Sequence, residues 1–365
     1  MHSAAETAWV ESLSPWPAEF GLDRMRALLH ELGDPQEAYP AVHVVGSNGK
    51  STTTRMTEAL LADAGLAVGA YLSPHVRGWS ERIRVRGEEA DFEQAVARVR
   101  EPAERLGATQ FEVLTAAALA EFAAQGVDAA VVEAGLGGRH DATNVLRSEV
   151  VVLTNVALEH TDVLGETRED IAAEKLAVVR PGALVVLGEP EWEEHARAEG
   201  AAGVVVAGRS NLALAMAAAE SFLGRRVDAA AAQDVALPGR LEHHGETPVE
   251  LWDGAHNLAG VGYLLGRVPT RNYVLVVSIL GDKRVEDMLR ALSVLGDTLV
   301  ATRSSNARAV PAGELAGRAE PYYGHVEAVE EPSAARARAR ELAGRGGAVL
   351  VTGSLYLLAD LSADQ

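Results

Sequence analysis

The chain has 365 residues, enough for about two domains, and its 48% hydrophobic and 23% charged content is typical of a globular protein. It contains no cysteine, which excludes disulfides, thiolate nucleophiles and cysteine-ligated metal sites. The net charge of −19 argues against a surface that grips a nucleic-acid backbone, and no apolar stretch approaches the ~18 residues of a membrane span. Residues 1–20 show no signal-peptide pattern. We therefore expect a monomeric cytoplasmic protein that binds neither nucleic acid nor a membrane.

The first part of the chain alternates short apolar strands with helices. A helix is predicted over 21–32, a strand over 41–45, a helix running to about residue 63, and a buried strand over 67–71. Helices are then expected over 91–105 and 111–124, and the second must be buried because it carries almost no polar residue. Further elements are predicted at 127–132, 150–153, 168–179, 184–187, 204–207 and 212–222. This order indicates an α/β domain with a doubly wound parallel sheet of the P-loop type.

A second, smaller α/β domain is predicted after a linker at 229–232. Strands are expected at 249–253, 273–279, 298–301 and 348–351, each followed by a turn and a helical pattern. An Arg- and Ala-rich segment at 334–345 is expected to be a solvated helix. The prediction is thus a P-loop domain over 1–234 and a Rossmann-like domain over 235–365.

A short polar loop separates the first strand from its helix. It consists of Gly46, Ser47, Asn48, Gly49, Lys50, Ser51 and Thr52. The glycines let backbone amides and the helix N-terminus face one anion, Lys50 adds charge, and Ser51 or Thr52 offers a hydroxyl to Mg²⁺. Only two residues separate Gly46 from the Gly-Lys pair, so the loop matches a shorter variant of the usual pattern. An ordinary strand-to-helix turn is the alternative.

Polar residues follow two later strands of the same predicted sheet. Glu133 ends a buried strand and faces a glycine-rich turn that contains Asp141, a place where open α/β sheets bind ligands. Glu133 is therefore a candidate metal carboxylate, with a turn-capping role as the alternative. His160 lies beyond the strand at 150–153 and is a candidate to ligate a metal or position a phosphate, although a structural role is also open.

Only three of the 33 basic residues are lysine, namely Lys50, Lys175 and Lys283. Arginine cannot replace lysine where a compact charge or a reactive amine is required, so these isolated lysines indicate special roles. Lys175 lies on an otherwise apolar stretch of predicted helix. It either extends to solvent, pairs with a carboxylate such as Glu174, or is buried with a task.

These motifs resemble those of the folylpolyglutamate synthase/dihydrofolate synthase family, which belongs with the Mur-type ATP-dependent amide ligases. The matching segments occur in family order at 46–52, 71–75, 80–83, 111–115, 132–144, 174–175, 238–240, 253–257 and 353–356. The resemblance implies that ATP phosphorylates the carboxylate of a folate or dihydropteroate. The amine of L-glutamate then attacks the acyl phosphate, and ADP and phosphate leave.

The resemblance also implies roles for individual residues. Lys50 and the hydroxyl of Ser51 or Thr52 would hold the ATP phosphates and one Mg²⁺. A second Mg²⁺ would be held by three residues from separate segments, Ser73, Glu133 and His160. Lys175 matches a lysine that is carbamylated in this family, and with Lys50 and His160 it completes the expected catalytic set. Three residues of the second domain match residues that reach the nucleotide, namely Arg240, Asp253 and His256.

The chain departs from the family pattern at a few positions. Ser51 stands where the folate enzymes usually have glycine, which resembles the loop of muramyl-peptide ligases, and Glu159 replaces an aspartate before His160. A Mur-type ligase acting on another carboxylate is therefore an alternative. The loop begins only 45 residues into the chain, so we expect no preceding sugar-nucleotide domain. A nucleotide-gated binding protein that has lost catalysis is a third hypothesis, but all four residues that such a loss would remove are present, namely Lys50, Glu133, His160 and Lys175.

Overall fold

The computed structural model describes residues 5–15, 17 and 20–363 and divides into two compact units. The first unit comprises the residues up to His75 and from Trp79 to Val235, and the second comprises Val76–Gly78 and the residues from Ala236 onward. The outer limits predicted for the two domains, residues 1 and 365, lie outside the described residues. None of the described helices is long and apolar enough to cross a membrane.

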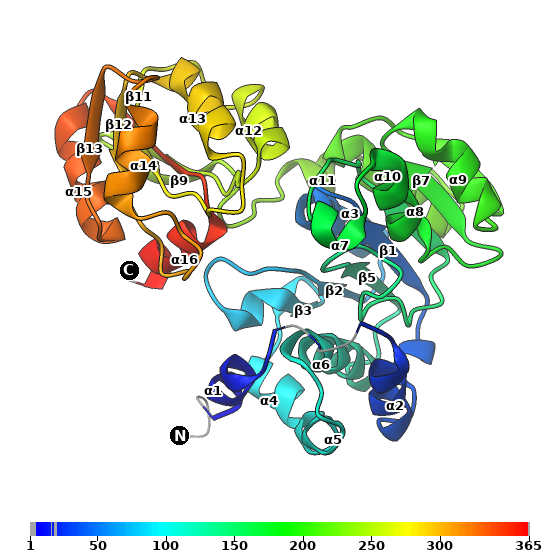
Figure 1. Ribbon diagram of the computed structural model, residues 1–365. Coiled ribbons are helices and arrows are strands. Elements are labelled where there is room, and N and C mark those ends of the chain that lie inside the picture. Colours follow the sequence, from blue (N-terminus) through cyan, green and yellow to red (C-terminus); the bar gives the residue numbers. More distant parts are fainter. Residues whose placement is uncertain (1–4, 16, 18–19, 364–365) are drawn as a thin grey trace. The chain divides into compact units, whose positions relative to one another are not determined.

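The first unit is organised around an eight-stranded sheet with the order β4-β3-β2-β5-β1-β6-β7-β8 (Figure 1). Its strands are β1 (Ala41–Val45), β2 (Val68–Tyr71), β3 (Ile83–Val85), β4 (Glu88–Glu89), β5 (Ala129–Glu133), β6 (Val150–Leu153), β7 (Leu184–Leu187) and β8 (Gly203–Val206). The six strands from β2 to β8 in this order are parallel, and β3 and β4 add an antiparallel edge. β1 and β5 lie at the centre and are buried throughout, which explains their uninterrupted apolar runs.

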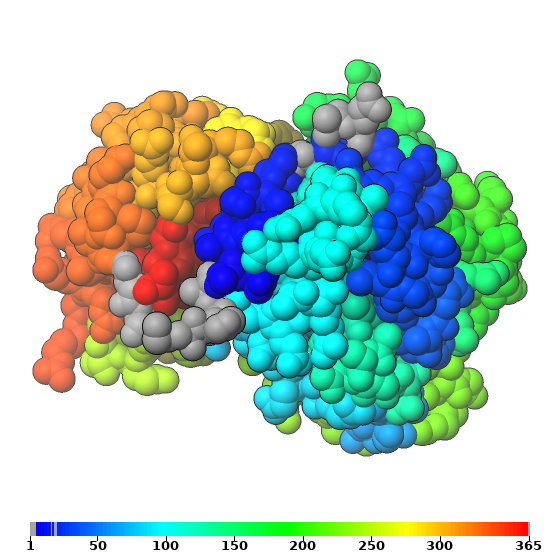
Figure 2. Space-filling view, turned by 90° about the horizontal axis from the view of Figure 1, so that it is seen from below, coloured from blue at the N-terminus to red at the C-terminus, as the bar shows by residue number. Residues whose placement is uncertain are grey.

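Helices cover both faces of this sheet. They are α1 (Ala5–Ser12), α2 (Asp23–Glu31), α3 (Lys50–Asp63), α4 (Phe92–Ala97), α5 (Arg100–Leu106), α6 (Gln110–Ala124), α7 (Thr161–Leu164), α8 (Arg168–Leu176), α9 (Glu193–Ala198), α10 (Asn211–Leu223) and α11 (Ala230–Gln233). Short 3₁₀ helices lie at η1 (Pro35–Glu37), η2 (Trp79–Arg82) and η3 (Pro190–Trp192). One face packs on α3 and α10, and the other packs on α6 in one half and on α8 and α9 in the other. The contact between α1 and α4 is visible at the surface in blue and cyan (Figure 2).

Two predictions in this unit are wrong, one of a helix and one of a linker. The single helix expected over 91–105 is two helices, because Pro102 has no amide to bond the carbonyl of Arg98, and the chain restarts so that this proline falls in the first turn of α5. The linker expected over 229–232 is instead the short helix α11, whose Ala232 is fully buried against α3. Alanine is small enough for this close packing. A run of alanines also resembles the composition of a linker, which explains the wrong prediction.

The second unit contains a six-stranded sheet with the order β13-β12-β11-β14-β10-β9. Its strands are β9 (Glu242–Glu246), β10 (Val249–Trp252), β11 (Tyr273–Val277), β12 (Thr298–Ala301), β13 (His325–Ala328) and β14 (Ala348–Thr352). Its helices are α12 (Leu258–Leu265), α13 (Val285–Leu292), α14 (Ala312–Ala319), α15 (Pro332–Ala343) and α16 (Leu355–Ala363), with a 3₁₀ turn η4 at Ser293–Leu295. All neighbours are parallel except β9, and α12 to α14 cover one face while α15 and α16 cover the other.

The helix α15 differs from its prediction as a solvated helix. Ala335 and Ala339 are fully buried against the sheet. Arg336 and Arg340 reach inward from the same helix and bond to the buried carboxylate of Glu250 on β10. Arg336 and Arg340, which the sequence pattern places at the surface, are therefore the counter-ions of the buried Glu250.

Candidate active site

The loop between β1 and α3, residues 46–52, is shaped so that only glycine fits at two of its positions. Gly46 has a φ of 143°, and a Cβ there would lie 1.9 Å from the hydroxyl oxygen of Thr154. Gly49 has a φ of 82°, and its Cβ would come within 2.5 Å of Asn211 Oδ1. A side chain is excluded by both the backbone conformation and the lack of space. The loop therefore curls tightly, and the first amides of α3, from Lys50 onward, face outward without acceptors inside the helix.

The segment after β6 holds the backbone of this loop. Asn155 accepts from the Ser47 amide through its carbonyl at 3.0 Å and from the Asn48 amide through Oδ1 at 3.1 Å. The Asn155 amide group and the Thr154 hydroxyl both donate to the Asn48 carbonyl, at 2.9 and 2.8 Å. The sequence analysis assigned no role to Thr154 or Asn155, and their only signal was their place at the carboxyl end of β6. These four bonds hold the backbone of the loop in place before any ligand binds.

Lys50 and Lys175 meet at this loop although they are far apart in the chain. The Nζ of Lys50 donates to the Gly46 carbonyl at 3.0 Å, and the Nζ of Lys175 donates to the same oxygen at 3.2 Å. Lys175 is only 2% exposed, so the prediction that it is buried rather than extended to solvent is confirmed. Two ammonium groups on one neutral acceptor create a strongly positive spot in a protein of net negative charge.

The surroundings of Lys175 change its proton affinity. Burial lowers the pKa of Lys175 to about 8, the carboxylate of Glu159 opposes that change, and the charge of Lys50 adds to it. Glu159 Oε1 lies 3.6 Å from the lysine Nζ. The alternative pairing with Glu174 is wrong, because Glu174 accepts instead from Arg139 Nε at 3.2 Å. Lys175 can therefore lose its proton near neutral pH.

Glu133 is at the end of β5, as predicted, is 1% exposed, and contacts the phosphate loop through Ser51. Its Oε1 accepts from the Ser51 hydroxyl at 2.9 Å, and its Oε2 accepts from the Ser73 amide at 3.0 Å. Of the two loop hydroxyls predicted for a metal, Ser51 is the one that bonds to this carboxylate. A buried carboxylate and a hydroxyl form a set of hard oxygen ligands, which Mg²⁺ and Mn²⁺ prefer.

His160 occupies a different environment. It is exposed, has a φ of 49°, and begins the one-turn helix α7. In the part of the chain that the structure describes, no three His, Asp or Glu side chains converge as a metal site. Glu133 and Ser51 offer one carboxylate and one hydroxyl. A metal bound there would therefore complete its coordination shell with oxygens from phosphate and water. The metal role of His160 and of the Ser73 side chain stays a prediction.

A buried arginine near Glu133 was not among the predicted site residues. Arg82 is 8% exposed, donates from Nε to His75 Nδ1 at 2.9 Å, and interacts with Tyr71. Burial, together with the charge of Arg82, lowers the pKa of His75 to about 3, so this imidazole stays neutral. Arg82 lies in the family-like segment 80–83, but the sequence analysis assigned it no role in the site. It provides a buried cation whose charge interacts with Glu133.

The glycine-rich turn after β5 packs on the helix that carries Lys175. A Cβ on Gly138 would lie 2.6 Å from the carbonyl oxygens of Glu174 and Lys175, so glycine is required there. Asp141 stabilises the turn by accepting from the Leu136 amide at 2.7 Å. The turn and α8 thus position each other beside the phosphate loop.

The second unit brings its three predicted site residues together. Asp253 directly follows β10 and accepts from the amides of Leu241 and Ala255 at 3.1 and 3.0 Å. Burial raises the pKa of Asp253, and the nearby Arg240 guanidinium opposes this. His256 Nδ1 bonds to the Gly254 carbonyl at 2.8 Å, which directs the other ring nitrogen away from the backbone. These groups form a compact polar cluster at the carboxyl end of β10.

Comparisons with known proteins agree with this arrangement. Residues 44–229 match the Mur ligase middle domain, and residues 239–355 match the Mur ligase glutamate ligase domain. The chain is 32% identical to the dihydrofolate synthase/folylpolyglutamate synthase of Mycobacterium tuberculosis over 85% of its length and 80% of that protein. It is 31% identical to the enzyme of the same name from Escherichia coli, covering 98% of this chain and 94% of that protein.

Solved structures give the same result. Escherichia coli FolC in complex with DHPP and ADP is similar with a TM-score of 0.89 at 29% identity, covering 100% of this chain and 98% of that one. A bifunctional folylpolyglutamate synthase/dihydrofolate synthase with Mn, AMPPNP and L-glutamate bound is similar with a TM-score of 0.87 at 30% identity, covering 100% of this chain and 98% of that one. The predicted two-sheet α/β fold is therefore confirmed.

Proposed function

The chain belongs to the folylpolyglutamate synthase/dihydrofolate synthase family of Mur ligases, and we propose that it joins L-glutamate to the carboxylate of a dihydropteroate or folate. ATP phosphorylates that carboxylate, the amine of L-glutamate attacks the acyl carbon, and phosphate leaves with formation of the amide. The carboxylate loses one oxygen to phosphate, and the attacking amine loses protons, so the atoms balance. The alternative of a nucleotide-gated binding protein has no support in the residues present.

The observation that carries this proposal is the pair of ammonium groups on Gly46. The γ-phosphate of ATP and a substrate carboxylate repel each other, so their reaction requires concentrated positive charge at the point of contact. Lys50 supplies it, with its Nζ 3.0 Å from the Gly46 carbonyl oxygen beside the first amides of α3, and Lys175 adds to it only while its amine is protonated and carries no carbamate. A phosphate that enters the loop replaces the weak carbonyl contact with charge-assisted bonds.

The metal implied by this family fits the residues present. Glu133 and the hydroxyl of Ser51 or Thr52 would hold Mg²⁺, which would neutralise phosphate charge during transfer. The Ser51 hydroxyl and the Ser73 amide already fix the orientation of the Glu133 carboxylate. Arg82 limits the negative potential around that carboxylate. The protein thus provides oriented oxygen ligands without excess negative charge at the site.

We assign Lys175 a further role as the site of a carbamate. A neutral amine attacks CO₂, forms a nitrogen–carbon bond and releases one proton, which leaves a carboxylate at the end of the lysine. The lowered pKa of Lys175 makes the neutral amine available near neutral pH. The resulting anion would lie between Lys50 and Glu159 and would help to orient the phosphate through Lys50. Arginine could not form this group.

The polar cluster of the second unit would bind the nucleotide. Arg240 supplies a cation for phosphate, and Asp253 supplies a carboxylate whose orientation is fixed by the amides of Leu241 and Ala255. A carboxylate of this kind suits a ribose hydroxyl, because it accepts hydrogen bonds in a fixed direction. A monomeric state and a cytoplasmic location also stay predictions.

The test is ADP release measured with each substrate omitted in turn. We expect release only when ATP, Mg²⁺, L-glutamate and a pterin substrate are all present, with dihydropteroate and reduced folates tested side by side. Glu133→Ala should reduce release at least ~100-fold while circular dichroism stays unchanged, as expected for loss of a metal-binding carboxylate. Release with a muramyl substrate and with no pterin would instead support the Mur-type alternative.

A further inference from the structure

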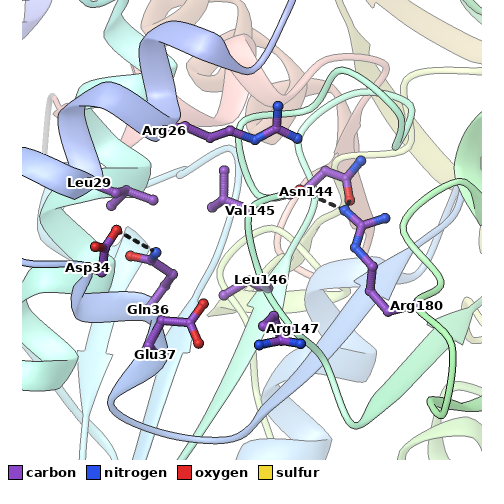
Figure 3. A pocket seen from close by; sticks show the side chains of 10 residues that line it. All are labelled: Arg26, Leu29, Asp34, Gln36, Glu37, Asn144, Val145, Leu146, Arg147 and Arg180. Atoms are coloured by element: carbon purple, nitrogen blue, oxygen red, sulfur yellow. Dashed lines mark hydrogen bonds between the residues drawn. The ribbon is translucent and has the colours of Figure 1, made fainter.

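A pocket of about 280 Å³ lies in the first unit away from the phosphate loop. Its walls come from α2, from the η1 segment before β1, from the turn before β6 and from the turn before β7 (Figure 3). All these segments except α2 enter the amino ends of parallel strands, whereas the phosphate loop leaves the carboxyl end of β1. Five residues of strand span about 16 Å, so the pocket lies on the opposite edge of the sheet. Its size is near the lower end for small-molecule sites.

Three arginines line this pocket, and their one ion pair among the described residues is the 3.5 Å contact of Arg26 with the exposed Asp23. Arg180 donates only to neutral oxygens, at 2.6 Å to Asn144 Oδ1, 3.1 Å to the Asn144 carbonyl and 3.2 Å to the Ala177 carbonyl. Arg26 faces it closely enough that, after burial, its charge is the next cause that lowers the pKa of Arg180. Arg147 is exposed and has no hydrogen bond or ion pair to any described residue. Like charges that face a shared cavity favour an anion between them.

The opposite wall offers hydrogen-bond acceptors. Asp34, Gln36 and Glu37 lie together there, across the pocket from Arg26 and Arg180 (Figure 3). Gln36 Nε2 donates to Asp34 Oδ1 at 3.3 Å, so its Oε1 is left buried without a donor among the described residues. The Glu37 carboxylate is exposed and likewise makes no ion pair to a described side chain. A buried acceptor without a donor is costly, and a ligand ammonium would satisfy it.

We propose that this pocket is a second ligand site, specific for an acidic α-amino acid. Such a molecule has two carboxylates for the three arginines and one ammonium for the wall of Asp34, Gln36 and Glu37. Its net charge of minus one matches the single excess positive charge of the pocket. The inference of an acidic α-amino acid comes from the charge pattern of the pocket and does not depend on the proposed function. The choice of L-glutamate as the amino acid to test does rest on the proposed function.

The pocket is connected to the active site through its walls. Arg180 follows α8, the helix that carries Lys175, and bonds to Asn144. Asn144 Nδ2 donates in turn to the carbonyl of Arg139 in the glycine-rich turn at 2.9 Å. Occupancy of the pocket would therefore fix the end of α8 relative to that turn.

The direct test is labelling of arginines by a dicarbonyl reagent, with the rate at each residue read by mass spectrometry. The full chain is used without ATP or pterin, so the result does not depend on catalysis and can succeed or fail independently of the proposed function. We expect millimolar L-glutamate to slow the labelling of Arg26 and Arg147 several-fold and L-lysine to leave it unchanged. The exposed Arg345, which lines no part of the pocket, is the internal control. Equal rates with and without L-glutamate would overturn the proposal.

A comparison of two ligands tests whether the wall of Asp34, Gln36 and Glu37 binds an ammonium group. Glutarate has the carboxylates of L-glutamate but no amino group, so it should protect Arg26 about tenfold less effectively, the value of one charge-assisted hydrogen bond. Glu37→Gln, an exposed change that should not disturb folding, should reduce that preference. Arg26→Ala, whose one ion pair is to the exposed Asp23 at 3.5 Å, should abolish the protection of Arg147. Equal protection by both ligands would contradict the assignment of an amino acid.

Discussion

Lys175 in the first unit and Glu250 in the second are both buried charged side chains, but their surroundings differ. Glu250 is 0% exposed and accepts from Trp252 Nε1 at 2.7 Å, from Arg336 Nε at 2.6 Å, and from Arg340. Burial alone would raise the pKa of Glu250, yet the bonds from Arg336 and Trp252 lower it overall. Lys175 has one shared carbonyl and one carboxylate at 3.6 Å, and its pKa falls toward neutrality.

The difference separates a structural charge from a reactive one. Glu250 accepts four hydrogen bonds, three of them from arginine, so its ionised state is fixed and it joins α15 to β10. Lys175 has too few acceptors, so its charge costs stability and can be exchanged for another chemical state. Burial of a charge therefore does not by itself indicate function. The balance of its partners does.

The largest expected effect is on activity when Lys175 is replaced. Lys175→Arg keeps the charge but cannot form a carbamate, so we expect turnover to fall about 1,000-fold, or about 4 kcal/mol of transition-state stabilisation. Lys175→Ala should recover part of its activity with a short carboxylic acid, which can take the place of the carbamate. Lys50→Ala, which removes the other lysine on the same carbonyl, should not be rescued. Turnover of Lys175→Arg near that of the wild type would remove the carbamate from the mechanism.

The next effect is on stability and concerns the other buried charge. Glu250→Ala leaves Arg336 and Arg340 without their buried acceptor, and we expect a loss of about 3–5 kcal/mol in the free energy of unfolding. Urea denaturation of the variant measures this loss. Turnover per folded molecule should stay near that of the wild type, because Glu250 is not part of the phosphate-loop site. A stable but inactive variant would contradict the distinction between the two charges.

Many element bounds, and the importance of Lys175, could be predicted from the sequence. The bounds of β1, β6 and β12 follow from short apolar runs, and those of α3 follow from the glycine loop before it and Gly65 after it; strong local signals of this kind survive in the structure. The rarity of lysine indicated Lys175 before any contact was known. Strand β13 was missed because it lies at a sheet edge and contains charged residues, so it lacks the apolar run of a central strand.

Partners could not be predicted because they come from distant segments. Glu159 is the carboxylate beside Lys175, although Glu174 is its neighbour in sequence, since a helix directs successive residues to different sides. The arginines of α15 show the same limit, because alternating Arg and Ala gives no sign of which arginines face a buried acid. Sequence identified the reactive groups, whereas the fold determined their charge balance.

A smaller effect is expected on stability when the amine of Lys175 is removed. Its pKa of about 8 in the folded state lies below the ordinary 10.5, so the buried charge destabilises the protein fully below pH 8, and this penalty disappears as pH rises toward 10.5. Lys175→Met should therefore be inactive yet more stable at pH 7, by about 3 kcal/mol, from 1.36 kcal/mol per pKa unit. Urea denaturation at pH 7 and pH 10 measures the gain, which should shrink at the higher pH. A variant less stable than wild type at pH 7 would contradict an uncompensated charge.

The smallest effect concerns Glu159, the carboxylate that raises the pKa of Lys175 against the influence of burial. Glu159→Gln should lower that pKa further, so the neutral amine should form at lower pH and the acid limb of kcat/KM should move in the same direction. The matched control is Glu174→Gln, which removes a carboxylate next to Lys175 in sequence but paired with Arg139. Its profile should coincide with that of the wild type. An acid limb that moves in Glu174→Gln and not in Glu159→Gln would mean that sequence proximity, rather than the 3.6 Å contact, sets the charge balance of Lys175.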